Sequence, residues 1–102
     1  MENELLIPEV VPQRVGDVLP HQARVNVTFR DQNGDLPDPV NFDASDADVK
    51  GWLTETIRTG GIPGIPATAQ VDLTDYKVDR FGPTEARPYN LLSVRPKTAF
   101  GV

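Results

Sequence analysis

Few residues of this chain carry side chains that could do chemistry, and none forms a catalytic pattern. The one histidine, His21, follows Pro20 in a proline-rich stretch. A general base must be held within about 3 Å of the proton it removes, so His21 is badly placed for that role. The carboxylates of Asp43, Asp46 and Asp48 lie around an expected helix start. None of them is predicted to lie in an apolar cleft, where a pair of carboxylates could do acid–base work. We therefore expect no catalytic residues and no enzyme activity.

Metal and cofactor sites are not indicated either. The spacing of Asp31, Asn33 and Asp35 resembles part of a calcium loop. In an EF-hand, however, glycine is sixth and glutamate twelfth, whereas here Gly34 is fourth and Phe42 twelfth. The chain has no cysteine, which excludes a thiol nucleophile and a Cys-based zinc site. Its paired glycines follow the expected helix, so no helix N-terminus faces them as in a phosphate site. We expect no metal and no cofactor.

The charge and the hydrophobicity of the chain indicate which classes of partner it is not expected to bind. The formal net charge is −5, which repels the phosphate backbone of nucleic acids. Arg87, Arg95 and Lys97 could form a local basic stripe, but a solvated strand end explains them better. No apolar run approaches the roughly 20 residues of a membrane span. The start, "MENELLIPEVVP", is acidic and interrupted by prolines, unlike a signal peptide. We expect a cytoplasmic monomer that binds neither nucleic acid nor membrane.

The first regular element expected is a half-buried strand over residues 23–30, "ARVNVTFR". Val25, Val27 and Phe29 alternate with polar side chains, and β-branched residues favour strands. The following Asn33-Gly34 pair predicts a tight turn, because both residues tolerate positive φ. "VNFDA" at 40–44 then places apolar side chains on one face. Together these features predict a β-hairpin with a long connection.

Residues 45–59, "SDADVKGWLTETIRT", predict the one clear helix. Ser45 and Asp48 resemble a capping box, and Gly60-Gly61 predicts the helix end. The apolar residues fall at helical spacing and predict a buried face that includes Trp52 as a core anchor. This face consists of Val49, Trp52, Leu53 and Ile57. Ile62 and Ile65, in the connector that follows, are expected to close the end of the core.

The stretch "VDLTDYKVDR" at 71–80 allows two interpretations. In the first, "VDL" is a short strand or strand end, and "LTDYKV" is a compact turn that buries Leu73, Tyr76 and Val78. In the second, residues 68–79 form one long strand with a bulge near Thr74. "FGPTEARPYN" is expected to be loop. "NLLSVRP" at 90–96 alternates again and predicts a last strand, with Leu92 facing the core.

Three motifs in this order resemble the ubiquitin-like β-grasp family. "DASDADVKGWLTETI" resembles the acidic start and capped helix of that family, and "GGIPGIP" is similar to its Gly-Ile-Pro after the helix. "LTDYKVDRF" resembles its turn before the last strand. The likeness covers residues 23–96. It implies an α+β fold in which a mixed sheet of about four strands packs on one helix.

The resemblance also shapes the expected function. We divide the chain into a flexible segment (1–22), a β-grasp domain (23–96) and a short tail (97–102). By elimination and by the fold class implied, we expect a non-catalytic protein-interaction module, an adaptor or a subunit of a larger assembly. The alternative is a modifier or carrier that acts through Gly101 after loss of Val102. Extended apolar segments bind grooves and sheet edges, so the expected partner-binding residues are Leu5, Leu6, Ile7, Val10 and Val11.

Overall fold

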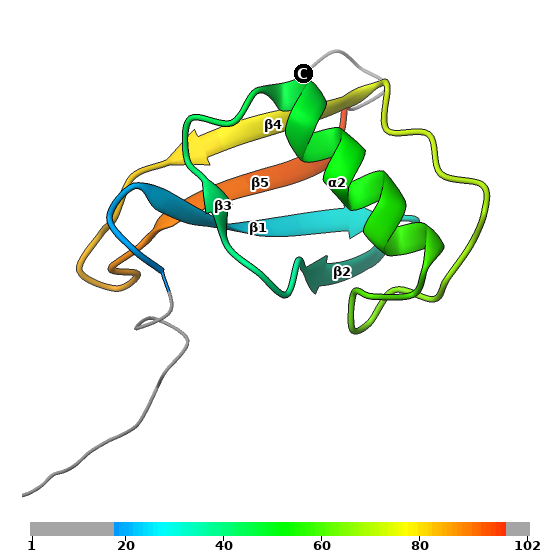
Figure 1. Ribbon diagram of the computed structural model, residues 1–102, viewed down its shortest axis with the longest axis horizontal. Helices are drawn as coiled ribbons and strands as arrows, with labels where there is room; N and C mark the ends of the chain where they lie inside the picture. Colours follow the sequence, from blue (N-terminus) through cyan, green and yellow to red (C-terminus); the bar gives the residue numbers. More distant parts are fainter. Residues whose placement is uncertain (1–17, 98–102) are drawn as a thin grey trace, which may run out of the picture.

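The chain is organised around a strand with one buried and one exposed face. The computed structural model describes residues 18–97 of the 102, and Figure 1 shows their arrangement. Strand β1 (Gln22–Phe29) buries every second side chain. Val25, Val27 and Phe29 all lie in the core, so the strand predicted from their alternation is confirmed.

The turn after β1 is not where the sequence predicted it. Strand β2 (Gln32–Asp35) pairs antiparallel with the end of β1. Only Arg30 and Asp31 lie between them, with φ of 52° and 66°. These left-handed values are those of a two-residue hairpin turn. The predicted turn at Asn33-Gly34 is therefore wrong, and this pair lies within β2.

Gly34 is required for packing and not for turning. A Cβ at this position would lie 2.6 Å from Cγ2 of Ile62 and 2.7 Å from the carbonyl oxygen of Pro63. The connector after the helix therefore packs directly on the backbone of β2. Beyond an interruption at residues 36–39, strand β3 (Val40–Asn41) pairs with the start of β1. The predicted hairpin thus has a second strand in two pieces.

The predicted helix is confirmed as α2 (Asp46–Arg58). The Asp48 N–H donates to Oγ of Ser45 at 3.0 Å, which caps the first turn. Gly60, with φ of 75°, follows the last turn and ends the helix as predicted. The helix buries Val49, Leu53 and Ile57 against the sheet.

Trp52 is not a core residue, contrary to the sequence prediction. It is 43% exposed, whereas Val49 and Leu53 are fully buried. The residues that α2 buries are spaced by four, so they form a narrow stripe along the helix. A helix that packs on a single sheet needs only a narrow buried stripe. Trp52 lies at the edge of this stripe, so its side chain is partly exposed.

The segment between α2 and the last strands closes one end of the core. Ile62 and Ile65 are buried there, as predicted. Residues 71–73 form no strand, so that part of the prediction is wrong. The Tyr76 N–H donates to the Leu73 carbonyl oxygen at 3.0 Å, which closes a turn with Leu73 buried. The compact turn is therefore right for Leu73–Asp75 but wrong for Tyr76–Val78, which are strand and only partly buried, and the long strand over 68–79 is wrong.

The strand that follows this turn was not foreseen. Strand β4 (Tyr76–Phe81) runs antiparallel to strand β5 (Asn90–Pro96). The predicted loop over 81–90 is confirmed for residues 82–89, while Phe81 belongs to β4 and Asn90 to β5, and the predicted strand at 90–96 is confirmed. The sequence prediction placed Tyr76–Val78 in the turn and Phe81 in a loop, and both assignments are wrong because these residues belong to β4.

The strands form one mixed sheet in the order β2-β1-β5-β4, with β3 also paired to β1. The central strands β1 and β5 run parallel, and Val25 lies opposite Leu92. Figure 1 shows α2 lying across one face of this sheet. The described residues therefore form a small α+β domain with one helix and five strands, one more strand than the sequence predicted.

Candidate functional site

The residues proposed from the sequence as functional lie outside the described residues. This holds for the expected partner-binding residues Leu5, Leu6, Ile7, Val10 and Val11, and for Gly101. Candidate surfaces therefore come from residues 18–97. Two surfaces stand out, one on the sheet face that α2 leaves uncovered and one at the end of the core.

The uncovered sheet face, here called the outer face, is polar over most of its area. On β1 and β2, Asn26 donates through Nδ2 to Asn33 Oδ1 at 2.8 Å and to Asp35 Oδ1 at 2.9 Å. Asn33 in turn donates to Asn26 Oδ1 at 2.9 Å and to Thr28 Oγ1 at 3.0 Å. These side chains satisfy one another, so this half of the outer face offers few free groups to a partner.

A charged cluster occupies the other half of the outer face. Arg95 Nη2 lies 3.0 Å and Lys77 Nζ 3.6 Å from Asp79 Oδ2. The hydrogen bond from Arg95 is the main reason that the pKa of the Asp79 carboxyl lies below its usual value. Asp79 is therefore ionised at neutral pH and neutralises part of the positive charge of this cluster.

One row across the outer face contains two apolar side chains and one arginine. Phe81 on β4 lies directly opposite Leu91 on β5, and Leu91 lies opposite Arg24 on β1. Phe81 is 43% exposed and Leu91 is half-buried. We call Phe81, Leu91 and Arg24 the outer row. Its two apolar side chains are neighbours on a face that is otherwise polar.

The cation of the outer row is loosely held. Arg24 Nη2 lies 3.5 Å from the carbonyl oxygens of both Leu36 and Pro37. Both distances are at the upper limit of a hydrogen bond. Within residues 18–97, the buried Nη1 atom has no hydrogen-bond partner. The hydrogen bonds of this guanidinium are therefore weak, and its Nη1 atom is unpaired among the described residues.

Sequence reasoning found part of this row. Because Val25 and Leu92 were predicted to face the core, the alternation along each strand placed Arg24 and Leu91 on the opposite side, which is correct. Sequence reasoning missed Phe81, because this residue was assigned to a loop. The alternation of Tyr76, Val78 and Arg80 with their neighbours is the signal that could have shown β4, and with it the outward position of Phe81.

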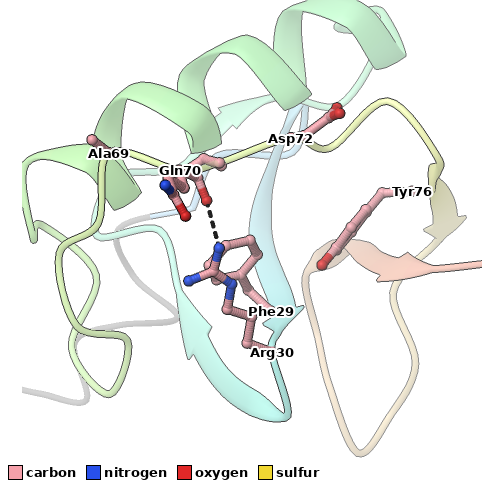
Figure 2. A pocket seen from close by; sticks show the side chains of 7 residues that line it. Phe29, Arg30, Ala69, Gln70, Asp72 and Tyr76 are labelled. Atoms are coloured by element: carbon pink, nitrogen blue, oxygen red, sulfur yellow. Dashed lines mark hydrogen bonds between the residues drawn. The ribbon is translucent and has the colours of Figure 1, made fainter.

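The second surface is a cleft of about 440 Å³ at the end of the core. It is lined by the end of β1, the connector and the start of β4, namely Phe29, Arg30, Ala69, Gln70, Val71, Asp72 and Tyr76. Figure 2 shows the Arg30 side chain reaching toward the connector, where Nη2 donates to the Gln70 carbonyl oxygen at 2.8 Å. The cleft thus joins a cation to apolar walls.

Two ionisable groups of the cleft have shifted pKa values. Burial raises the pKa of the Tyr76 hydroxyl, and the nearby positive charge of Arg30 opposes this rise. Hydrogen bonds from Thr74 lower the pKa of the Asp72 carboxyl, whose Oδ1 accepts the Thr74 N–H at 3.0 Å. At neutral pH, Tyr76 therefore carries its proton and Asp72 is ionised.

Three further features of the described residues concern metal binding, membrane spans and the histidine. Among residues 18–97, no group of three or more His, Cys, Asp or Glu side chains is placed to hold a metal ion. No helix in this part of the chain has the length and the apolar composition needed to cross a membrane. His21 is exposed, and its backbone carbonyl accepts the Phe42 N–H at 2.9 Å.

Comparison with protein-family models, with curated proteins and with solved structures gave no match. Function therefore has to be inferred from the two surfaces of the chain itself.

Proposed function

We propose that this chain is a non-catalytic protein-interaction module of the ubiquitin-like β-grasp fold, and that it docks a partner protein on the outer row. The fold part of the proposal is supported by the order of the elements. A hairpin precedes the helix, and the last strand β5 returns parallel to β1 in the centre of the sheet. One helix covers one face of this sheet (Figure 1), and no second helix among residues 18–97 covers the other.

The observation that carries the functional part is the adjacency of Phe81, which is exposed, and Leu91, which is half-buried. Single exposed apolar residues are common. Phe81 and Leu91 are adjacent to each other near one end of an otherwise polar sheet face, and contiguous apolar surface is typical of docking sites. Aromatic and arginine side chains are enriched at the energetic centre of protein interfaces. Arg24 adds a cation whose hydrogen bonds within the chain are weak, and the polar groups around the pair can form the rim of an interface.

Substitution of the pair tests this function. The double variant Phe81→Ser with Leu91→Ser removes the apolar surface, and Trp52→Ser is the matched control because Trp52 is equally exposed but lies on the helix. Proteins captured from host cells by the native chain would be purified and titrated against each variant. We expect the double variant to lose binding at least tenfold and the control to bind normally, with unchanged circular dichroism for both.

Two results would contradict the proposal. If the double variant bound every purified partner as tightly as the native chain does, the outer row would not be the docking surface. The fold is tested separately by nuclear Overhauser effects, because the parallel register places Val25 opposite Leu92 and Val27 opposite Val94. If a solution structure lacked this pairing, the chain would not be a β-grasp.

A further inference from the structure

Arg30 is held at the cleft by three separate features. It adopts a left-handed φ of 52°, which is uncommon for a side chain without an amide or carboxyl group. Its guanidinium carbon lies 5.0 Å from the centre of the Phe29 ring, a cation–π distance. Its Nη2 atom donates to the Gln70 carbonyl oxygen. The guanidinium is therefore oriented before any ligand arrives.

Part of this guanidinium is still available. Within residues 18–97, Nε and Nη1 of Arg30 make no hydrogen bond, and no carboxylate forms an ion pair with it. A guanidinium presents five N–H donors in a planar fork that fits a carboxylate. The cation at the cleft thus has unused donors on a fixed group.

Tyr76 adds a second donor. Its ring packs against Phe29 with 6.4 Å between the ring centres, and its hydroxyl has no partner among the described residues. In Figure 2 this hydroxyl points toward Phe29 and Arg30, while the Asp72 carboxylate points away from both. An anion in the cleft would meet two donors and no facing negative charge.

Part of the lining of the cleft is apolar. Phe29, Ala69 and Val71 line the cleft, and its volume of about 440 Å³ holds a few side chains of a peptide. One cation with one hydroxyl matches a single carboxylate better than a phosphate, which needs more donors. The net charge of −5 also disfavours polyanions.

We propose that the cleft binds a carboxylate side chain, glutamate or aspartate, presented by an extended and otherwise aliphatic segment of a partner protein. Arg30 and Tyr76 hold the carboxylate, and the aliphatic neighbours pack on Ala69 and Val71. The unusual backbone of Arg30 supports this role, because strained positions cluster at binding sites. Asn or Gly would suit the turn better, so the turn alone does not require arginine.

This site is separate from the outer row. The cleft includes Tyr76 at the start of β4, whereas Phe81 lies at its other end, roughly 17 Å away along an extended strand. The two residues also face opposite sides of the sheet, because five positions separate them. Either proposal can therefore fail without the other.

A matched pair of peptides tests the proposal. Acetyl-Val-Glu-Val-amide would be titrated into the full ¹⁵N-labelled chain, and acetyl-Val-Gln-Val-amide is the control without the charge. We expect the glutamate peptide to shift the Arg30 Nε–H signal and the backbone signals of Ala69 and Val71. The glutamine peptide should bind roughly tenfold more weakly or worse, because a charge-assisted hydrogen bond is lost. Equal binding of the two peptides, or shifts that map elsewhere, would overturn the proposal.

Substitutions distinguish two roles of Arg30, binding of the carboxylate and support of the connector through its hydrogen bond to Gln70. Arg30→Asn keeps a residue that tolerates positive φ and should lower affinity for the glutamate peptide at least tenfold. Tyr76→Phe keeps the ring and should lower it about threefold to tenfold. The control Arg58→Gln removes the same charge from an exposed helix end and should bind normally. If Arg30→Asn is folded by NMR and binds the peptide as tightly as the native chain, the assignment is wrong. If it does not fold, unchanged affinity in Tyr76→Phe would be enough to reject the site.

Discussion

Gly34 and Ile62 are in such close contact that no side chain fits between them. A Cβ on Gly34 would lie 2.6 Å from Cγ2 of Ile62, and it would also meet the Pro63 carbonyl oxygen at 2.7 Å. Backbone cannot retreat as easily as a flexible side chain, so an added methyl group must displace the connector. This contact explains why β2 carries a glycine that does not form a turn.

Gly34→Ala should therefore destabilise the domain by about 1–3 kcal/mol, the usual effect of overpacking. Gly51 provides the control, because it lies within α2 and a Cβ there would meet nothing within 4 Å. Gly51→Ala should stabilise the domain by about 0.5–1 kcal/mol through helix propensity. Urea unfolding of the two variants measures both effects. A neutral Gly34→Ala would show that the connector does not pack on β2 as described.

Trp52 and Leu53 are adjacent in sequence but differ in burial, and their variants should differ accordingly. Leu53→Ala removes a fully buried side chain and should cost about 2–5 kcal/mol. Trp52→Ala removes a side chain that is 43% exposed and should cost about 1 kcal/mol or less. The difference in urea midpoint between the variants is the measurement. A loss of equal size for both would restore the prediction that Trp52 is a core anchor.

The error at Trp52 shows what helical spacing can and cannot predict. The positions of Val49, Leu53 and Ile57 predicted the buried stripe correctly, because these residues are four apart on one side of the helix. How wide the stripe is depends on what the helix packs against. One sheet covers less of a helix than a surrounding core does. The sequence of the helix itself does not show which of the two it packs against.

Turn and strand prediction shows the same limit. The alternation of β1 and β5 and the cap at Ser45 were readable, because each depends on residues within one short segment. Asn33-Gly34 was misread, since the need for a glycine there comes from Ile62, 28 positions later. The cleft was missed for the same reason. It brings Arg30 together with Gln70 and Tyr76, and no local pattern joins such distant residues.

Asp79 should make stability depend on pH in the acid range. Its carboxyl has a lowered pKa in the folded chain, first because of the hydrogen bond from Arg95. The stabilising contribution is therefore complete above the unfolded pKa of about 3.9, and it is lost as pH falls through the lower folded value. We expect Asp79→Asn to have a lower urea midpoint than the native chain at pH 7 and the same midpoint at the lowest pH.

Salt provides the control for this pH effect. Asp79 and its partners are partly exposed, so 1 M NaCl should reduce the difference between the two chains at pH 7. A difference in midpoint that persists unchanged from pH 7 to the lowest pH would mean that the carboxylate charge does not contribute. The asparagine would then act only through its shape or its amide.

Arg80 connects β4 to the start of the helix, and its loss should weaken that junction. Nη1 donates to the Phe42 carbonyl oxygen at 2.7 Å, and Nη2 donates to the Ala44 carbonyl oxygen and to Asp46 Oδ1 at the same distance. Arg80→Ala should cost about 1–3 kcal/mol, because these acceptors lose a shared charged donor. Arg80→Lys should recover less than half, since a single ammonium cannot reproduce the planar fork.

The matched control for Arg80 is Arg58→Ala, which breaks an exposed pair with Glu55 within the helix. Such pairs contribute about 0.5 kcal/mol or less, so this variant should be nearly neutral. Hydrogen exchange at the Val49 amide, which bonds to the Ser45 carbonyl in the first turn of α2, reports on the junction itself. It should become faster in Arg80→Ala and stay unchanged in Arg58→Ala. Equal stability and equal exchange in the two variants would show that Arg80 is a surface charge and does not hold the helix to the sheet.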